Sequence, residues 1–180
     1  MITRPDDKDF LINIAGFGGA WFALIYFAAN GSEGLGLAIA LAVVALHLWQ
    51  SPDWIAELQL IVFATAFGVM AEALVMYLRL VTYSGAALQG GLPPAWVIAQ
   101  WTLFSTLLNV TLRPLRGWVL LSLGLGFVFL PIAKLVGMKF GVVEMQLPIY
   151  RSIALIGLCW SMALVILFAA ARLWDCWREL

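Results

Sequence analysis

The stretch IALIGLCWSMALVILFAAA, residues 153–171, contains no charged side chain, and it decides the fold class. A helix needs about 20 predominantly apolar residues to cross the hydrocarbon core of a bilayer, and this stretch with its flanks supplies them. The strands of a membrane barrel would instead alternate apolar and polar residues over about ten positions. Because the apolar run is continuous, it predicts a membrane-spanning helix over residues 149–173.

The whole chain shares this apolar character. Of its 180 residues, 64% are hydrophobic and 11% are charged, with ten basic and ten acidic side chains and a net charge of zero. A soluble domain is about half apolar and about a quarter charged, and one of this length cannot hide so much apolar surface. The composition excludes a soluble enzyme, a nucleic-acid-binding protein and a disordered chain. It predicts an integral membrane protein whose first partner is the lipid bilayer.

Further apolar runs predict an all-α, polytopic membrane protein, a bundle of six transmembrane helices with short loops in a single domain, residues 1–180. Glycines and prolines between residues 82 and 94, and again at 114 and 117, cannot continue a helix and therefore separate the runs. Trp49, Trp54 and Trp118 fall near the predicted ends, at the headgroup level that indole rings prefer. The predicted spans cover residues 10–29, 35–49, 55–78, 95–112, 118–133 and 149–173, the fifth interrupted at Pro131.

The distribution of Lys and Arg predicts the orientation. With six spans, both termini share one side, and that side receives six basic residues at positions 4, 8, 113, 116, 172 and 178. The other side receives four, at positions 79, 134, 139 and 151. Because basic residues are enriched in cytoplasmic loops, we expect both termini in the cytoplasm and the chain in a bacterial inner membrane.

Glu72 lies well inside the predicted third span. An ionisable group in hydrocarbon is costly and normally faces the bundle interior. With a rise of about 1.5 Å per residue along antiparallel spans, Lys134 is the cation at the matching depth on another span. Three roles are open for Glu72: an ion pair with Lys134, a protonated acid in a packed bundle, or a ligand or proton site. We favour the ligand or proton site, because small residues around Glu72 leave room beside it.

Polar side chains recur along one face of the predicted fourth span, at positions 102, 105, 106, 109 and 113. Such side chains commonly join membrane helices, at about 0.6 kcal/mol per hydrogen bond on average. We expect helix packing as their main role, with part of a ligand site as the alternative. Gln100 lies on another face, at the depth of Glu72. The candidate ligand-binding or proton-site residues are Glu72, Lys134, Gln100, Thr102, Ser105 and Asn109.

Recognisable catalytic motifs are missing from the sequence. There is no HExxH, no GxSxG and no phosphate-binding loop, so a non-enzymatic function is favoured and no cofactor is expected. The two cysteines match no metal or redox spacing. His47 stands without the Cys or carboxylate cluster that a metal ion needs, so we expect it to pack at the membrane interface, and we expect no metal site.

Residues 93–117, PPAWVIAQWTLFSTLLNVTLRPLRG, have a Pro-x-Trp start, an aromatic-rich span and an Asn before Leu-Arg-x-Leu. In these features the chain resembles a bacterial inner-membrane family catalogued as domain of unknown function 2878. The resemblance implies an architecture and a compartment, but no activity and no catalytic residue. Members of that family often carry an acid in the third span, where this chain has Glu72. Their genes tend to lie near genes for modifying fatty acyl chains, which implies a lipid-related role.

Three functions therefore compete. The first is an accessory factor in envelope or fatty-acyl lipid metabolism, with another membrane protein as partner, and a filled bundle without a pocket would favour it. The second is a small-solute carrier like the substrate-binding membrane subunit of a vitamin importer, which a solute-sized cavity would favour. The third is a lipid-modifying enzyme, which a lateral opening between spans would favour. The sequence alone favours the first.

Overall fold

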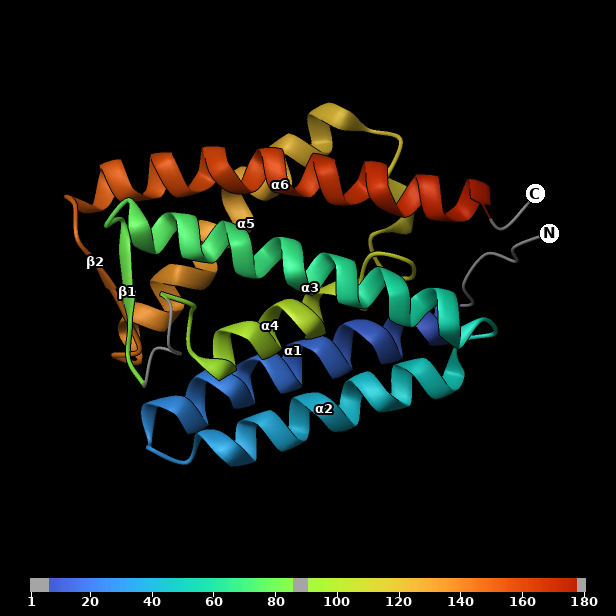
Figure 1. Ribbon diagram of the computed structural model, residues 1–180, viewed down its shortest axis with the longest axis horizontal. Helices are drawn as coiled ribbons and strands as arrows, with labels where there is room; N and C mark the ends of the chain where they lie inside the picture. Colours follow the sequence, from blue (N-terminus) through green and yellow to red (C-terminus); the bar gives the residue numbers. More distant parts are fainter. Residues whose placement is uncertain (1–6, 86–90, 178–180) are drawn as a thin grey trace.

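The computed structural model describes residues 7–85 and 91–177 and places most of them in helices (Figure 1). Most helix bounds agree with the predicted spans to within a few residues. In chain order the elements are α1 (Asp7–Ala29), α2 (Glu33–Gln50), α3 (Trp54–Tyr77), β1 (Val81–Tyr83), α4 (Ala95–Ser105), the 3-10 helix η1 (Arg113–Leu115), α5 (Val119–Lys139), β2 (Val143–Met145) and α6 (Ile149–Trp177).

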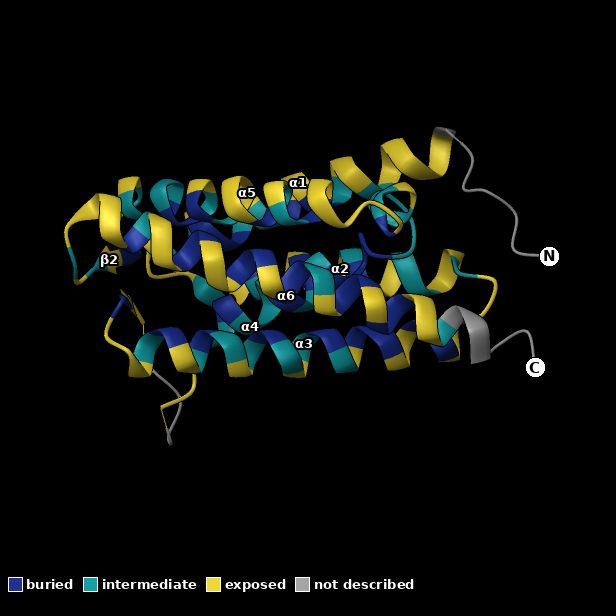
Figure 2. Ribbon diagram, turned by 90° about the horizontal axis from the view of Figure 1, so that it is seen from above, coloured by how far each residue is buried: buried dark blue, intermediate teal, exposed yellow. Residues whose placement is uncertain are grey.

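Five of the described helices, α1, α2, α3, α5 and α6, are long and apolar enough to cross a membrane. Their outward faces carry large apolar side chains, such as Leu120 at 85% exposure and Met70 at 70%. Figure 2 shows exposed residues on the outside of the helices and buried ones between them. In water such a surface would be unfavourable, whereas lipid chains solvate it. The predicted all-α fold is confirmed.

Helix α4 lies in the interior of the bundle. It packs against α1, α2 and α3, while α5 and α6 pack on each other and α6 also contacts α3 (Figure 1). From Pro93 to Arg113 every residue is buried or half-buried, so this segment does not face lipid. Helix α1 begins and α6 ends at the same end of the bundle (Figure 1).

The predicted fourth span over residues 95–112 is wrong in its second half, because α4 ends at Ser105 and turns follow as far as Leu112. Ser105 donates to the Thr102 carbonyl at 2.5 Å, and Thr106 donates to the Leu103 carbonyl at 2.8 Å. Hydroxyl groups that bind nearby carbonyls compete with helical hydrogen bonds and weaken the helix at this point. At about 1.5 Å per residue, eleven helical residues reach about 16 Å, too short to span a bilayer.

Side chains from other segments satisfy the carbonyl groups that the break frees. Arg116 donates to the Leu108 carbonyl, through Nε at 3.1 Å and through Nη2 at 2.8 Å. Asn13 on α1 donates to the Thr106 carbonyl at 3.2 Å. Non-helical backbone at membrane depth is tolerated only where protein buries it, and this segment meets that condition.

The expected interruption at Pro131 is also wrong, since α5 continues through Pro131 to Lys139. Proline has no N–H, so the carbonyl of Phe127 loses its helical donor. That carbonyl faces α6, where a Cβ at Gly157 would lie 2.9 Å from its oxygen. Close packing against a neighbouring helix allows membrane helices to continue past a proline. The extra turn after Pro131 carries Lys134 into the bundle.

Between the helices the chain also forms a short two-stranded ribbon, which the sequence does not predict. Strand β1 follows α3 and pairs with β2, which follows α5, in antiparallel register with Tyr83 opposite Val143. The Ser84 N–H donates to the Val142 carbonyl at 2.9 Å, and the Gln146 N–H donates to the Leu80 carbonyl at 3.1 Å. The ribbon ties α3 to α5 at one end of the bundle (Figure 1).

Close contact between α5 and α6 depends on Gly126. A Cβ there would lie 2.7 Å from the Trp160 carbonyl oxygen and 2.8 Å from the Ser161 Cα, both backbone atoms. We expect Gly126→Ala to force the two helices apart and to lower the free energy of unfolding by about 1–3 kcal/mol. Thermal unfolding in detergent measures this change. Gly124→Ala is the matched control, because a Cβ at Gly124 meets nothing within 4 Å. Equal melting temperatures for the two variants would contradict this packing.

Candidate functional site

Glu72 and Lys134 form a buried ion pair. The Nζ atom of Lys134 lies 2.6 Å from Oε1 of Glu72, and their side chains are 8% and 3% exposed respectively. Tyr83 completes the group: its hydroxyl donates to Oε2 of Glu72 and accepts a hydrogen bond from Lys134 at 2.5 Å. The structure thus contains the Glu72–Lys134 ion pair, one of the three roles that the sequence leaves open for Glu72. Removing either charge would strand the other in an apolar environment.

Three separate elements bring these side chains together. Glu72 is on α3, Lys134 is on the part of α5 beyond Pro131, and Tyr83 is on β1. Tyr83 is therefore placed by the pairing of β1 with β2 rather than by a helix. Burial, and then the neighbouring Glu72 carboxylate, raise the pKa of Tyr83 well above its ordinary value near 10. The phenol therefore stays neutral and acts as a hydrogen-bond donor to the carboxylate.

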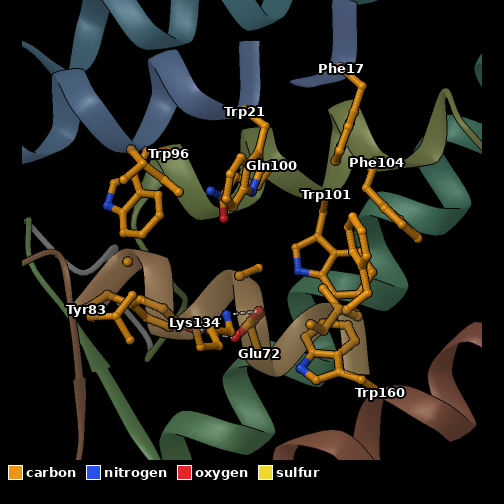
Figure 3. Close-up of a pocket in the computed structure, with 16 residues that line it drawn as sticks. Phe17, Trp21, Glu72, Tyr83, Trp96, Gln100, Trp101, Phe104, Lys134 and Trp160 are labelled. Carbon is orange, nitrogen blue, oxygen red and sulfur yellow. Dashed lines mark hydrogen bonds and ion pairs between the residues drawn. The ribbon is translucent and has the colours of Figure 1, made fainter. Parts of the chain in front are cut away.

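A cavity lies beside the ion pair, where α1, α3, α4, α5, α6 and the ribbon meet. Figure 3 shows Trp21 and Gln100 on one side of it and the Glu72–Lys134 pair on the other. The cavity has a volume of about 50 Å³. One water needs about 10–15 Å³, so the cavity has room for a few waters; it is about a third of the volume, about 150 Å³, of an apolar cavity that holds benzene.

Aromatic rings make up much of the cavity wall. Trp101 and Trp160 stack with their ring centroids 4.3 Å apart, and Tyr83 meets Trp96 edge to face at 5.7 Å. The Lys134 ammonium lies 4.7 Å from the Tyr83 ring centroid and 5.8 Å from that of Trp160, within cation–π range. Trp101 also fills the space over Gly68, where a Cβ would lie 2.0 Å from its ring.

The structure brings only three of the six predicted site residues together. Glu72, Lys134 and Gln100 line the cavity. Thr102 donates to the Ile98 carbonyl and accepts from Thr65 on α3 at 3.2 Å, so it joins two helices. Ser105 and Thr106 are fully buried, which confirms that they do not face lipid. The turn after α4 carries Asn109 away from the cavity altogether.

Asn109 belongs to a second polar network at the opposite end of α3. Its amide nitrogen donates to Glu57 and its amide oxygen accepts from Arg116. His47 on α2 contacts the same Glu57 carboxylate at 2.9 Å, so it does more than pack at an interface. Asn13 lies 3.5 Å from the His47 ring and accepts from Thr111 at 2.7 Å. This network joins α1, α2 and α3 to the turns after α4.

Three residues of these polar networks escape the sequence reasoning. Glu57 follows Asp53, the N-cap of α3, and therefore looks like an ordinary acid of a first helical turn. Arg116 looks like a cytoplasmic loop charge, yet it is only 8% exposed. Tyr83 lies in a loop without hydrophobic periodicity. The one available signal for Glu57 and Arg116 is that a buried charge needs a partner of opposite sign. Among the described residues no three His, Cys, Asp or Glu side chains gather as metal ligands do.

Long apolar helices that enclose buried charges and a cavity are characteristic of multi-pass membrane proteins, and the fold points to that class. Within it, the chain belongs to the family described as protein of unknown function (DUF2878), whose model matches residues 10–166. The match includes both polar networks and the whole cavity wall. Neither a curated protein nor a solved structure matches the chain significantly.

Proposed function

We propose that the protein is a membrane carrier or receptor for a small solute, which it binds in the cavity beside Glu72 and Lys134. The observation that supports this function is the cavity itself, with an ion pair on one side and aromatic walls around it. Ligand sites typically combine apolar and aromatic walls with a few polar groups that fix orientation.

The six-span topology is part of this proposal. Helix α4 and the buried turns to Leu112 together form the fourth crossing, since they run from the ribbon end of α3 to its Glu57 end. Discontinuous crossings of this kind occur in transporters, where they lie next to the substrate. We place the protein in the bacterial inner membrane with both termini in the cytoplasm. An accessory role in fatty-acyl lipid metabolism with a membrane partner, and lipid modification, are alternatives that only the family resemblance supports.

The orientation predicts the behaviour of a C-terminal fusion. A reporter that is active only in the periplasm should stay silent when it is fused after Leu180. The same reporter inserted after Asn30, in the turn between α1 and α2, should be active. A signal from the C-terminal fusion would reverse the orientation or change the number of crossings.

A cavity-filling variant tests the solute-binding function. Ala133 lines the cavity, so Ala133→Phe should occupy the space while it leaves the Glu72–Lys134 pair in place. Ile132 is 50% exposed on the outside of the same helix, so Ile132→Phe is the matched control. Native mass spectrometry of protein extracted directly into lipid nanodiscs should show a bound small molecule on the wild type and on Ile132→Phe, but not on Ala133→Phe.

Two further results decide the proposal. Lipid and metabolite profiles of a deletion strain should be restored by wild type and Ile132→Phe only. A wild-type protein without bound mass, or equal binding by the two phenylalanine variants, would contradict a ligand-binding cavity. Thermal unfolding of each variant shows that the loss of binding is not a loss of fold.

A further inference from the structure

The five long helices form an incomplete ring around α4. Helix α1 packs on α2, α2 on α3, α3 on α6 and α6 on α5, whereas α5 and α1 lack comparable packing among the described residues. Figure 2 places α1 and α5 on the face of the bundle opposite α3. At the ribbon end the Phe22 and Phe140 rings meet edge to face at 5.6 Å and join the two segments there. The ring is therefore least closed between α1 and α5.

The cavity lies behind this gap. Its wall includes Phe17 and Trp21 on α1, and Phe129 and Leu130 on α5. Phe129 is 55% exposed on the outside of α5 although it lines the cavity, and Trp21 and Leu130 are half-buried. A side chain that both faces lipid and lines a cavity marks the place where the cavity meets the bilayer. These residues put the mouth of the cavity between α1 and α5, and its rim is apolar.

The inner end of the cavity is polar. Gln100 on α4 is half-buried there, and its amide has no hydrogen-bond partner among the described residues. Across the cavity Lys134 donates to Glu72 and to Tyr83, which uses two of its three N–H groups (Figure 3). An unpaired amide at membrane depth is costly, so Gln100 calls for water or for a polar group of a ligand.

The volume limits what can enter. At about 50 Å³ the cavity takes a group the size of a few waters and not the rest of a molecule. A hydroxyl group has that size, and it can accept from Lys134 while it donates to the Gln100 amide oxygen. Because it is uncharged, it leaves the Glu72–Lys134 pair intact, whereas a carboxylate or an ammonium group would compete for one member of the pair.

Building on the proposed solute-binding function, we propose that the solute is a single-chain amphiphile with an uncharged hydroxyl end, which enters laterally from the bilayer. The hydroxyl group binds between Gln100 and Lys134, and the chain leaves between Trp21 and Phe129 and stays among the lipid chains. A carrier of amphiphiles and a lipid-modifying enzyme both need such an opening, so the fate of the bound molecule separates them.

Photolabelling locates the chain. A long-chain alcohol with a diazirine near its hydroxyl end is added to the protein in lipid nanodiscs and illuminated, and the labelled peptides are identified by mass spectrometry. Label should fall on α1 near Trp21 and on α5 near Phe129. Ala133→Phe fills the cavity, so it should remove this labelling. Ile132→Phe, at a side chain 50% exposed on the outside of the same helix, should keep it.

Competition defines the polar end. Unlabelled hexadecanol should displace the probe at a bilayer mole fraction at least about tenfold lower than hexadecane, ionised hexadecanoate or hexadecylammonium, because its hydroxyl group meets a charged donor without displacing a charge. Gln100→Leu should reduce the preference for hexadecanol over hexadecane about two- to tenfold. Gln50→Leu, at an exposed position at the end of α2, is the matched control and should keep the preference.

Each contrary result has its own meaning. Label spread evenly over the outer helix faces, or equal labelling of the two phenylalanine variants, would overturn lateral entry. Stronger displacement by either charged chain, or equal displacement by hexadecane, would overturn the hydroxyl end. Recovery of the probe in a chemically altered form would overturn carriage in favour of lipid modification. If the probes fail but a native bound mass is still lost only in Ala133→Phe, this inference falls and the proposed function stands with a different solute.

Discussion

Lys134→Met should lower the folded yield sharply and reduce the free energy of unfolding by about 3–5 kcal/mol, the usual cost of breaking a buried ion pair. The physical reason is that Glu72, with its side chain 3% exposed, would remain in the bundle without its cation. The hydrogen bond from Tyr83 would persist, but a neutral phenol does not replace an ammonium group. Fluorescence-detected size exclusion and thermal unfolding in detergent measure the two effects.

The double variant Glu72→Gln with Lys134→Met controls this prediction. It removes both charges and keeps similar side-chain volumes, so it should recover a large part of the lost stability. Lys139→Met, at an exposed position on the same helix, should change little. If the single and double variants were equally unstable, the energetic coupling between Glu72 and Lys134 would be absent.

Glu72→Gln by itself separates structure from binding. The amide keeps the shape of the carboxylate and an oxygen that can accept from Lys134, but it leaves the buried ammonium without its counter-ion, so the folded yield should fall. Complementation is therefore compared at equal amounts of folded protein. If Glu72 also serves the ligand, the variant should fail to complement a deletion strain. A Glu72→Gln protein that folds and complements fully would remove Glu72 from the functional site.

The positions of the helices, and the ion pair as one possible role of Glu72, were predictable because both follow from distances counted along the chain: the length of an apolar run and the rise per residue of a helix. Apolar runs of sufficient length have one stable state in a bilayer, which places α1, α2, α3, α5 and α6. A regular rise per residue converts position into depth, which pairs Glu72 with Lys134. Both inferences survive errors of a few residues at the helix ends, since a helical turn covers about 5.4 Å.

The ribbon and the second network were not predictable in the same way. Pairing of β1 with β2 depends on where two loops distant in sequence meet, so nothing local indicates that Tyr83 faces Glu72. The break after Ser105 has no proline or glycine to mark it, and Ser and Thr that bind nearby carbonyls also occur inside the unbroken α5 and α6. An unbroken helix would keep Asn109 on the same face as Thr102, whereas the turns carry it to Glu57 and Arg116.

This rearrangement changes the expected cost of losing Asn109. As an ordinary hydrogen-bonding residue between membrane helices, it would contribute about 0.6 kcal/mol. In the structure both of its amide atoms bind buried charged groups, Glu57 at 3% exposure and Arg116 at 8%. Hydrogen bonds to charged groups contribute about 1.5–3 kcal/mol each, and the charges left behind remain desolvated.

We therefore expect Asn109→Leu to lower the free energy of unfolding by about 2–4 kcal/mol, because leucine fills a similar space but bridges neither charge. Thr102→Val is the comparison: it removes the neutral hydrogen bond to Thr65 at 3.2 Å and should cost only about 0.6 kcal/mol. Chemical or thermal unfolding in detergent ranks the two variants. If they were equally mild, Asn109 would not bridge Glu57 and Arg116, and an unbroken fourth helix with Asn109 on the Thr102 face would describe the protein better. A large loss for Asn109→Leu alone would show that the turn after Ser105 holds charges from two segments together, which no continuous helix at that position would do.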